Sequence, residues 1–105
     1  MLQSLVVLNM SNCNLGSRSD CLKSFQSVSL PQVQLLNLAS NNLKSIYLKG
    51  RTLPNLSELV LSNNDLTSTE CLAALTNLVL LDLSFNQIAN FETLSSLSNL
   101  TFLAI

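Results

Sequence analysis

The stretch Leu78-Val79-Leu80-Leu81-Asp82-Leu83-Ser84-Phe85-Asn86-Gln87-Ile88 decides how this chain folds. It follows the pattern L-x-x-L-x-L-x-x-N-x-I, in which alternate residues point to opposite sides of an extended backbone. The leucines therefore share one face, the asparagine turns the chain, and the isoleucine brings it back to the interior. We interpret the stretch as a short strand followed by a turn, with one face of the strand buried.

The same pattern recurs along almost the whole chain of 105 residues. Close copies span residues 56–66 and 33–43, a weaker copy spans 5–15, and a truncated copy spans 100–105. The leucine that opens each repeat returns at nearly constant intervals, as Leu2, Leu30, Leu53, Leu75 and Leu97. One such unit cannot shelter its own leucines from water, so neighbouring units must stack on one another.

These repeats predict an α/β fold, a right-handed and curved solenoid in which about five short strands form one parallel sheet. The sheet should line the concave side. Returns made of 3₁₀ or short helices should line the convex side, because apolar residues there recur at every third position. The chain length suits one domain. We place that domain at 1–105, with repeats near 2–29, 30–52, 53–74 and 75–96 and a partial repeat at 97–105.

An asparagine recurs at the turn that follows the strand, as Asn41, Asn64 and Asn86. The side-chain amide both donates and accepts hydrogen bonds, so it can satisfy backbone groups that are buried where the chain bends inward. Cys13 takes this place in the first repeat, where its thiol is a weaker donor. We interpret Cys13 as part of the same series of turn residues and not as a reactive thiol.

The returns differ in length and in their signals for short helices. Asn90 and Thr67 can cap helical turns, and Thr67 with Glu70 has the spacing of a capping box. The first return is longer and predicts a fuller helix that begins near Asp20. Gly50 interrupts the second return, which should therefore be looser.

The fourth repeat carries a complete set of motif residues. They are Leu78, Leu81, Leu83, Asn86, Ile88, Phe91, Leu94 and Leu97. In this set the chain resembles the SDS22-like class of leucine-rich repeat proteins, whose short repeats match the spacing of Leu53, Leu75 and Leu97. The first repeat is more similar to the ribonuclease-inhibitor class, because it is longer than the others and has a cysteine in the asparagine place. The resemblance implies a protein-binding scaffold, a role found among phosphatase regulators and proteins of cilia, cytoskeleton and nucleus.

Nothing in the sequence predicts an enzyme, a cofactor or a metal site. The chain has no histidine, so the usual general base and the commonest zinc ligand are missing. It also lacks C-x-x-C, G-x-S-x-G and a glycine-rich phosphate loop. Asp65, Glu70 and Glu92 are best interpreted as solvated residues of turns and caps. We therefore expect no catalytic residues.

Composition argues against nucleic acid and membrane as partners. The net charge is −1, which gives no overall attraction to phosphate. No apolar run approaches the roughly 20 residues of a membrane-spanning helix. Hydrophobic residues make up 48% of the chain and charged residues 10%, so apolar surface is left over for a protein partner.

Cysteine usage favours a cytoplasmic, reducing compartment. The chain has three cysteines and none of the clusters that close the ends of secreted repeat arrays, and we see no signal peptide. Three N-x-S/T sequons, at Asn9, Asn55 and Asn99, favour the alternative of an extracellular recognition module. Because asparagine and serine are abundant here, we interpret the sequons as incidental.

Two columns of side chains should face outward from the strands on the concave side. Strands about 4.8 Å apart make each column continuous, so an apolar stripe should run beside a polar one. An apolar, weakly charged surface of this kind suits a protein partner, and Phe85, Leu80 and Phe102 are the best anchors by residue type. The candidate partner-binding residues are Val7, Asn9, Leu35, Asn37, Glu58, Val60, Leu80, Asp82, Phe85 and Phe102.

The ends of the array predict a second mode of association. The pattern opens on a strand and stops within another at Ile105, so both end repeats should expose apolar core and unpaired strand edges. Either the array belongs to a longer chain or its ends meet a partner. We therefore keep a homo-oligomer that stacks through its ends as an alternative to the scaffold.

Overall fold

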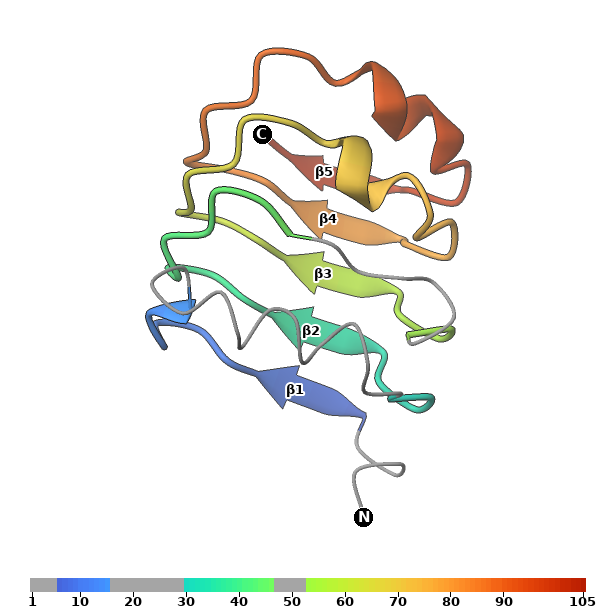
Figure 1. Cartoon of the computed structure of the whole chain (residues 1–105). Coiled ribbons are helices and arrows are strands. Elements are labelled where there is room, and N and C mark those ends of the chain that lie inside the picture. Colours follow the sequence, from blue (N-terminus) through green and yellow to red (C-terminus); the bar gives the residue numbers. More distant parts are fainter. Residues whose placement is uncertain (1–5, 16–29, 47–52) are drawn as a thin grey trace.

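Five short strands form a single parallel sheet in the computed structural model, which describes residues 6–15, 30–46 and 53–105. The strands follow one another across the sheet in sequence order (Figure 1). This arrangement confirms the predicted repeat fold. The strands are β1 (Val7–Asn9), β2 (Leu35–Asn37), β3 (Glu58–Val60), β4 (Leu80–Asp82) and β5 (Phe102–Ala104), and the 3₁₀ helices are η3 (Glu70–Leu72) and η4 (Glu92–Ser96).

The strands pair at the same motif position in every repeat. Leu59 at the centre of β3 lies between Leu36 of β2 and Leu81 of β4. Val7 pairs with Leu35 across the longer first repeat, just as the first residues of the later strands pair with one another. The extra length of the first repeat therefore leaves the register unchanged.

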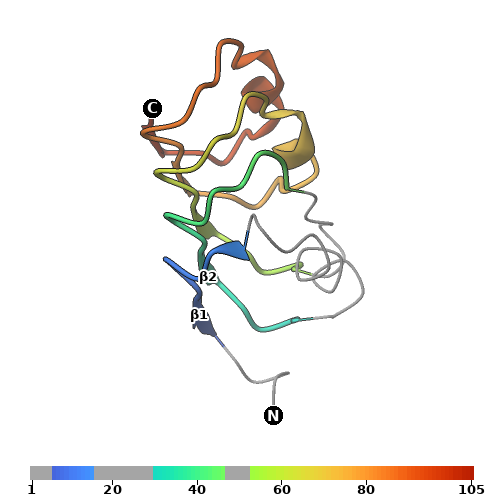
Figure 2. The ribbon, with the colours of Figure 1, turned by 60° about the vertical axis from the view of Figure 1, so that its left-hand side comes forward.

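The core lies between the sheet and the returns, which form opposite sides of the molecule (Figure 2). Leu36, Leu59 and Leu81 are fully buried along the inner face of the sheet. Burying each such side chain contributes about 1.5–3 kcal/mol. The corresponding Leu103 in β5 is 39% exposed, because no described residue covers the outer edge of that strand.

The turn asparagines satisfy buried backbone groups, as the sequence predicted, and in doing so they also join neighbouring coils. The Asn64 side-chain Oδ1 accepts the backbone N–H groups of Asn41 and Leu43, each at 3.0 Å. Its Nδ2 donates to the carbonyl groups of Leu38 at 3.1 Å and Leu61 at 2.9 Å. Asn64 is only 5% exposed, so these bonds satisfy backbone groups that water cannot reach.

Cys13 occupies the corresponding turn as a free, exposed thiol. Its Sγ donates to the carbonyl of Ser11 at 3.4 Å, two residues earlier, where the asparagines place one of their own amide bonds. Its backbone N–H donates to Oδ1 of Asn41 at 2.8 Å. Cys13 thus belongs to the series of turn residues, which confirms its interpretation as a structural position.

Neither predicted cap is the N-cap residue of a described 3₁₀ helix, since Phe91 holds that place in η4 and Thr69 holds it in η3. Asn90 lies one residue before the N-cap of η4, where its Oδ1 accepts the N–H of Glu92 at 2.9 Å. The capping box of Thr67 with Glu70 was wrong. Because η3 begins only at Glu70, the residue that accepts the Glu70 N–H is Ser68, through Oγ at 3.1 Å. The predicted helix near Asp20 and the loose segment at Gly50 lie outside the described residues.

Candidate protein-binding surface

The first and third residues of each strand point away from the core, and we call the surface they form the outer face. Strand register places these side chains in two columns. The first column is Val7, Leu35, Glu58, Leu80 and Phe102, and the second is Asn9, Asn37, Val60, Asp82 and Ala104. The columns are those expected from the sequence, because strict alternation fixes which side chains leave the core.

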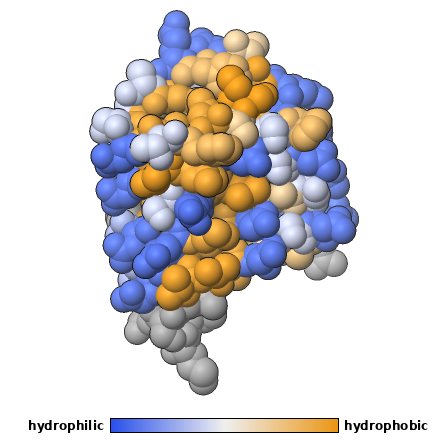
Figure 3. All heavy atoms as spheres, turned by 180° about the vertical axis from the view of Figure 1, so that it is seen from behind, coloured by the Kyte–Doolittle hydropathy of each residue, from blue (hydrophilic) through white to orange (hydrophobic). Residues whose placement is uncertain are grey.

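Apolar side chains gather in a band over the strands of the outer face, with polar residues on both sides of the band (Figure 3). Val7 and Phe102 are 55% and 54% exposed at the two ends of the first column. Leu35 and Leu80 are half-buried between them. The band is therefore open to solvent from β1 to β5, with a single charged interruption at Glu58.

The two columns exchange character between β3 and β4. Glu58 lies beside Leu80, and Val60 lies beside Asp82. The two carboxylates therefore occupy diagonal corners of a four-residue square, and the two apolar side chains occupy the others. From the spacing and rise of strands, the diagonal backbone positions are roughly 8 Å apart. An extended segment lying across these strands meets both apolar and acidic groups.

The polar residues of the second column also have a structural role. Oδ1 of Asn9, Asn37 and Asp82 accepts the backbone N–H of the residue two positions later, at 3.1, 3.0 and 3.0 Å. This local bond forms a turn at the end of the strand. These three side chains are therefore explained in part by the fold, whereas the apolar residues of the first column are not.

Phe85 lies just beyond β4 in an unusual backbone conformation. Its φ is +58°, in the left-handed region, and its side chain is 81% exposed. The same turn position holds Asn12, Ser40 and Asn63, which also have positive φ. The left-handed conformation costs an ordinary residue roughly 1–2 kcal/mol, and asparagine tolerates it best after glycine. Neither packing nor local conformational preference therefore accounts for a phenylalanine here.

Comparison with protein families gives the class of this domain. The family model described as Leucine Rich Repeat matches residues 4–26, 55–78 and 77–100. The chain belongs to the leucine-rich repeat family. A search of curated proteins gave no match. Leucine-rich repeat domains generally mediate protein–protein interactions and are typically non-catalytic.

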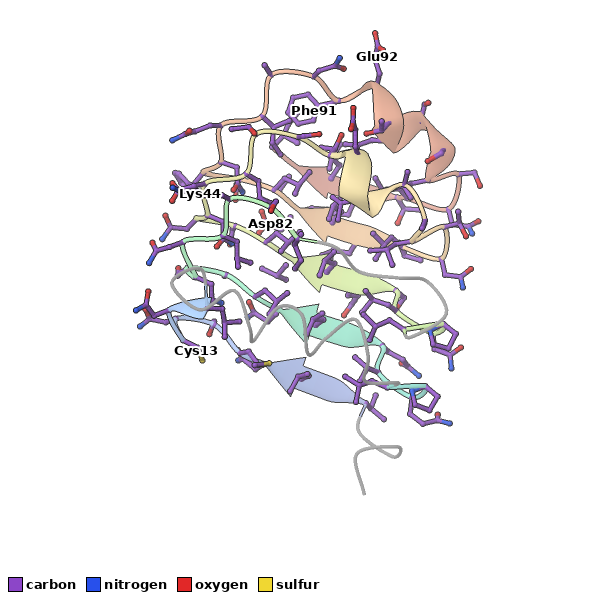
Figure 4. All side chains as sticks on the ribbon, viewed as in Figure 1. Cys13, Lys44, Asp82, Phe91 and Glu92 are labelled. Atoms are coloured by element: carbon purple, nitrogen blue, oxygen red, sulfur yellow. The ribbon has the colours of Figure 1, made fainter. Side chains whose placement is uncertain are left out.

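Charge on the outer face of this leucine-rich repeat domain is acidic. Glu58 and Asp82 contribute carboxylates, and the described residues add no lysine or arginine to either column. Lys44 is exposed on the side of the molecule where the turns lie (Figure 4). Glu92 is exposed at the start of η4 and points away from the helix, as expected for a solvated residue (Figure 4). A face of this charge repels nucleic-acid phosphates.

Two hollows of the leucine-rich repeat domain lie away from the outer face. One, of about 280 Å³, lies beside the starts of β3 and β4, and the other, of about 140 Å³, lies between the two 3₁₀ helices. Within the described residues, no group of three or more His, Cys, Asp or Glu side chains could hold a metal ion. The same residues include no helix long and apolar enough to span a membrane.

Sequence reasoning missed two exposed residues beside the outer face. Val6 and Val79 precede the first residues of β1 and β4 and are 43% and 41% exposed. The same position holds Gln34 and Thr101 in other repeats of the domain. A β-branched apolar residue where other repeats have polar ones was the available signal. These valines add exposed apolar surface directly before Val7 and Leu80 in the chain.

Proposed function

We propose that this leucine-rich repeat domain is a non-catalytic scaffold that binds a protein partner on the outer face of its sheet. The observation that carries the proposal is the band of solvent-exposed apolar side chains, which the chain's own packing does not use. Exposed apolar patches rimmed by polar residues mark interaction surfaces. The proposed contact residues are Val7, Asn9, Leu35, Asn37, Glu58, Val60, Leu80, Asp82, Phe85 and Phe102.

Three of these residues should contribute most of the binding energy. Phe85, Phe102 and Leu80 are the large apolar side chains near the C-terminal half of the sheet, and aromatic residues are enriched among binding hot spots. Leu80 and Phe102 lie on strands that pair with each other. Since backbone hydrogen bonds already fix these strands, little conformational entropy is lost when a partner binds.

Within the family, we place the domain in the SDS22-like class. The equal spacing along the chain of Glu58, Leu80 and Phe102, which pair across β3, β4 and β5, supports this assignment. The short 3₁₀ helices η3 and η4 in the returns support it as well. We propose the cytoplasm as its compartment. A reducing environment preserves an exposed free thiol such as that of Cys13.

The sequon asparagines have a structural explanation that supports a compartment without glycosylation. Nδ2 of Asn55 donates to the carbonyl of Pro31 at 2.6 Å, and Nδ2 of Asn99 donates to that of Thr76 at 3.1 Å. Asn77, which is not in a sequon, makes the equivalent bond to Pro54 at 2.8 Å. Asparagine recurs at this position to link coils, so two of the three sequons follow from the repeat.

Quantitative capture of partners from cell extract tests the proposed surface. The wild-type domain is compared with Phe102→Asp and Phe85→Asp, which place a charge on the apolar band. Ser95→Asp is the matched control, because Ser95 is an exposed residue of η4 on the other side of the molecule. We expect recovery of the bound protein to fall at least tenfold for the two outer-face variants and to stay unchanged for the control.

Circular dichroism and denaturant midpoints must show that the variants remain folded. Equal recovery by the wild type and both outer-face variants contradicts the proposal. Loss of recovery with Ser95→Asp alone also contradicts it, since the partner would then bind the returns.

A further inference from the structure

We infer that the partner segment on the outer face carries lysine or arginine among apolar side chains. This inference rests on the proposed function and adds the chemistry of the occupant. It depends on the diagonal arrangement of Glu58 with Asp82 and on the exposed ring of Phe85. Together these groups offer negative charge, an aromatic face and apolar contact in one region.

The carboxylates on this region have no cationic partner in the described part of the chain. Glu58 makes no side-chain hydrogen bond or ion pair with any described residue. Asp82 uses Oδ1 to accept from the N–H of Ser84 at 3.0 Å and from its Oγ at 2.6 Å. Its second oxygen makes no bond to a described residue. Both groups therefore favour a cation supplied from outside, which also sets the specificity of docking.

The ring of Phe85 follows Asp82 by three positions, just past the end of the same strand. Its left-handed backbone and its 81% exposure are not explained by the fold. Aromatic faces attract lysine and arginine side chains, more strongly when the contact is shielded from water, as beneath a bound segment. A cation that binds Asp82 can therefore also contact the Phe85 ring. The apolar residues next to that cation in the partner segment would lie on Val60, Leu80 and Phe102.

The probe for this inference is a displayed library of random dodecapeptides, selected on the purified domain. We expect the selected peptides to be enriched in lysine or arginine together with leucine and aromatic residues. One enriched peptide is then synthesised with a fluorophore, and its dissociation constant is measured by anisotropy at low and at high salt. We expect high salt to weaken binding by tenfold or more.

Matched variants separate charge from structure. Glu58→Gln with Asp82→Asn removes both charges but keeps the turn, because asparagine already makes the same bond in β1 and β2. Glu70→Gln with Glu92→Gln removes two exposed charges from the returns and is the control. We expect the first pair to weaken binding at least tenfold and the control pair less than twofold. Phe85→Asn should also weaken binding at least tenfold.

The outcomes distinguish this inference from the proposed function. Suppose that Phe102→Asp abolishes peptide binding but the double variant Glu58→Gln with Asp82→Asn keeps the wild-type affinity. That result overturns the inference of a cationic partner and leaves the proposed scaffold function intact. Peptides that bind all outer-face variants equally overturn both, as does a selection that yields no binding peptide. Light scattering tests whether the occupant is a second copy of the domain. A wild-type mass twice that of the monomer, which Phe102→Asp returns to the monomer value, would show this and would overturn the inference.

Discussion

At the scale of the residue, the buried asparagines give the repeat its precise spacing. Leucines fill space between coils without demanding a single arrangement, whereas an amide must meet donors and acceptors at fixed positions. Asn41 is fully buried, and its Nδ2 donates to the carbonyl groups of Met10 and Leu38, both at 2.9 Å. The asparagines therefore fix how one coil sits on the next.

Replacing Asn64 by alanine should lower the free energy of unfolding by about 3–5 kcal/mol. The change leaves several buried backbone groups without a partner, and each costs about 1–3 kcal/mol. Urea denaturation followed by circular dichroism measures the loss. Asn77→Ala is the control, since this exposed side chain makes one bond between coils and should cost less than about 1 kcal/mol. Equal losses of unfolding free energy in the two variants would contradict the claim that Asn64 stabilises the fold by hydrogen-bonding buried backbone groups.

Replacing Phe85 by asparagine should stabilise the domain by about 0.5–1.5 kcal/mol. Asparagine tolerates the left-handed conformation that Phe85 adopts, and Asn63 shows that it fits this turn position. Guanidinium denaturation of the wild type, Phe85→Asn and Phe85→Ala measures the effect. The alanine variant removes the ring without gaining the preference, so its stability should stay near that of the wild type. An asparagine variant less stable than the wild type refutes the argument.

The role of a residue was predictable from the sequence where the same residue type recurs at one position of every repeat. It was not predictable where the role depends on an unusual local backbone conformation. The role of Asn86 was predictable because Asn41 and Asn64 hold the same position in the repeats before it. The positive φ of Phe85 could not be predicted, because phenylalanine gives no sign of a left-handed turn. Its neighbours in the series, Asn63 and Ser40, carried part of that signal.

At the scale of the element, the returns are held together by polar contacts as well as by leucines. Thr69 is 1% exposed at a position where the repeat motif has an apolar residue. Its Oγ1 makes a hydrogen bond with Oγ1 of Thr93 in η4. The residue that caps η3 is thus linked to η4 by a pair of hydroxyl groups next to the core.

A double-mutant cycle should reveal coupling between these two threonines. Thr69→Val alone should destabilise the domain by about 1 kcal/mol, because Thr93 loses its partner. Adding Thr93→Val should restore most of that loss, because two apolar groups of the same shape replace the pair. Thermal and urea unfolding of the four proteins measure the coupling, which should exceed about 0.5 kcal/mol. Additive effects contradict a direct bond between the helices.

The short returns were predicted in type and only partly in detail. Spacing of apolar residues by three predicted the short helical return that η4 forms, but its N-cap is Phe91 and not Asn90. Asn90 contributes from one residue earlier, by accepting the Glu92 N–H. Thr67 was misassigned because a capping box needs the glutamate three residues after the N-cap, whereas Glu70 directly follows the N-cap Thr69. In η3 only three residues are helical, so the accepting side chain lies one residue closer to the helix.

At the scale of the whole molecule, protection should fall from the middle of the sheet to its last strand. The amide of Leu61 donates to Asp82 at 2.8 Å, and that of Leu83 donates to Ala104 at 2.7 Å. The bonds have nearly the same length, but the acceptor of Leu83 lies in β5, whose Leu103 is 39% exposed. Local opening of β5 should therefore free the Leu83 amide first.

Hydrogen exchange followed by NMR should show the amide of Leu61 at least tenfold better protected than that of Leu83. The amide of Leu38, which donates to Val60 at 2.8 Å, is the internal control and should resemble Leu61. Identical protection at all three amides indicates that the sheet opens only as one unit, and contradicts the gradient.

The outline of the whole fold and of the candidate surface was predictable from the repeat, and its chemistry was predictable only in part. Alternation of side chains along a strand predicts the columns that hold Leu80, Asp82 and Phe102. Periodicity does not give exposure, so the availability of Val79 depended on how adjacent strands pack. The meeting of Glu58 with Asp82 across a diagonal depends on register, which the equal spacing of the motif implies.

Within residues 6–15, 30–46 and 53–105, the asparagine side chains that link coils reach toward the preceding coil. Asn64 serves the coil before it, Asn86 serves the coil of Leu66 at 3.0 Å, and Asn99 reaches back to Thr76 in the same sense. When a later coil unfolds, the backbone N–H groups of the coil before it lose their asparagine acceptors. When an earlier coil unfolds, the N–H groups of the later coil keep the acceptor that the next coil supplies. The stack of coils is therefore directional, and local unfolding should begin more readily at its C-terminal coil than at its N-terminal coil.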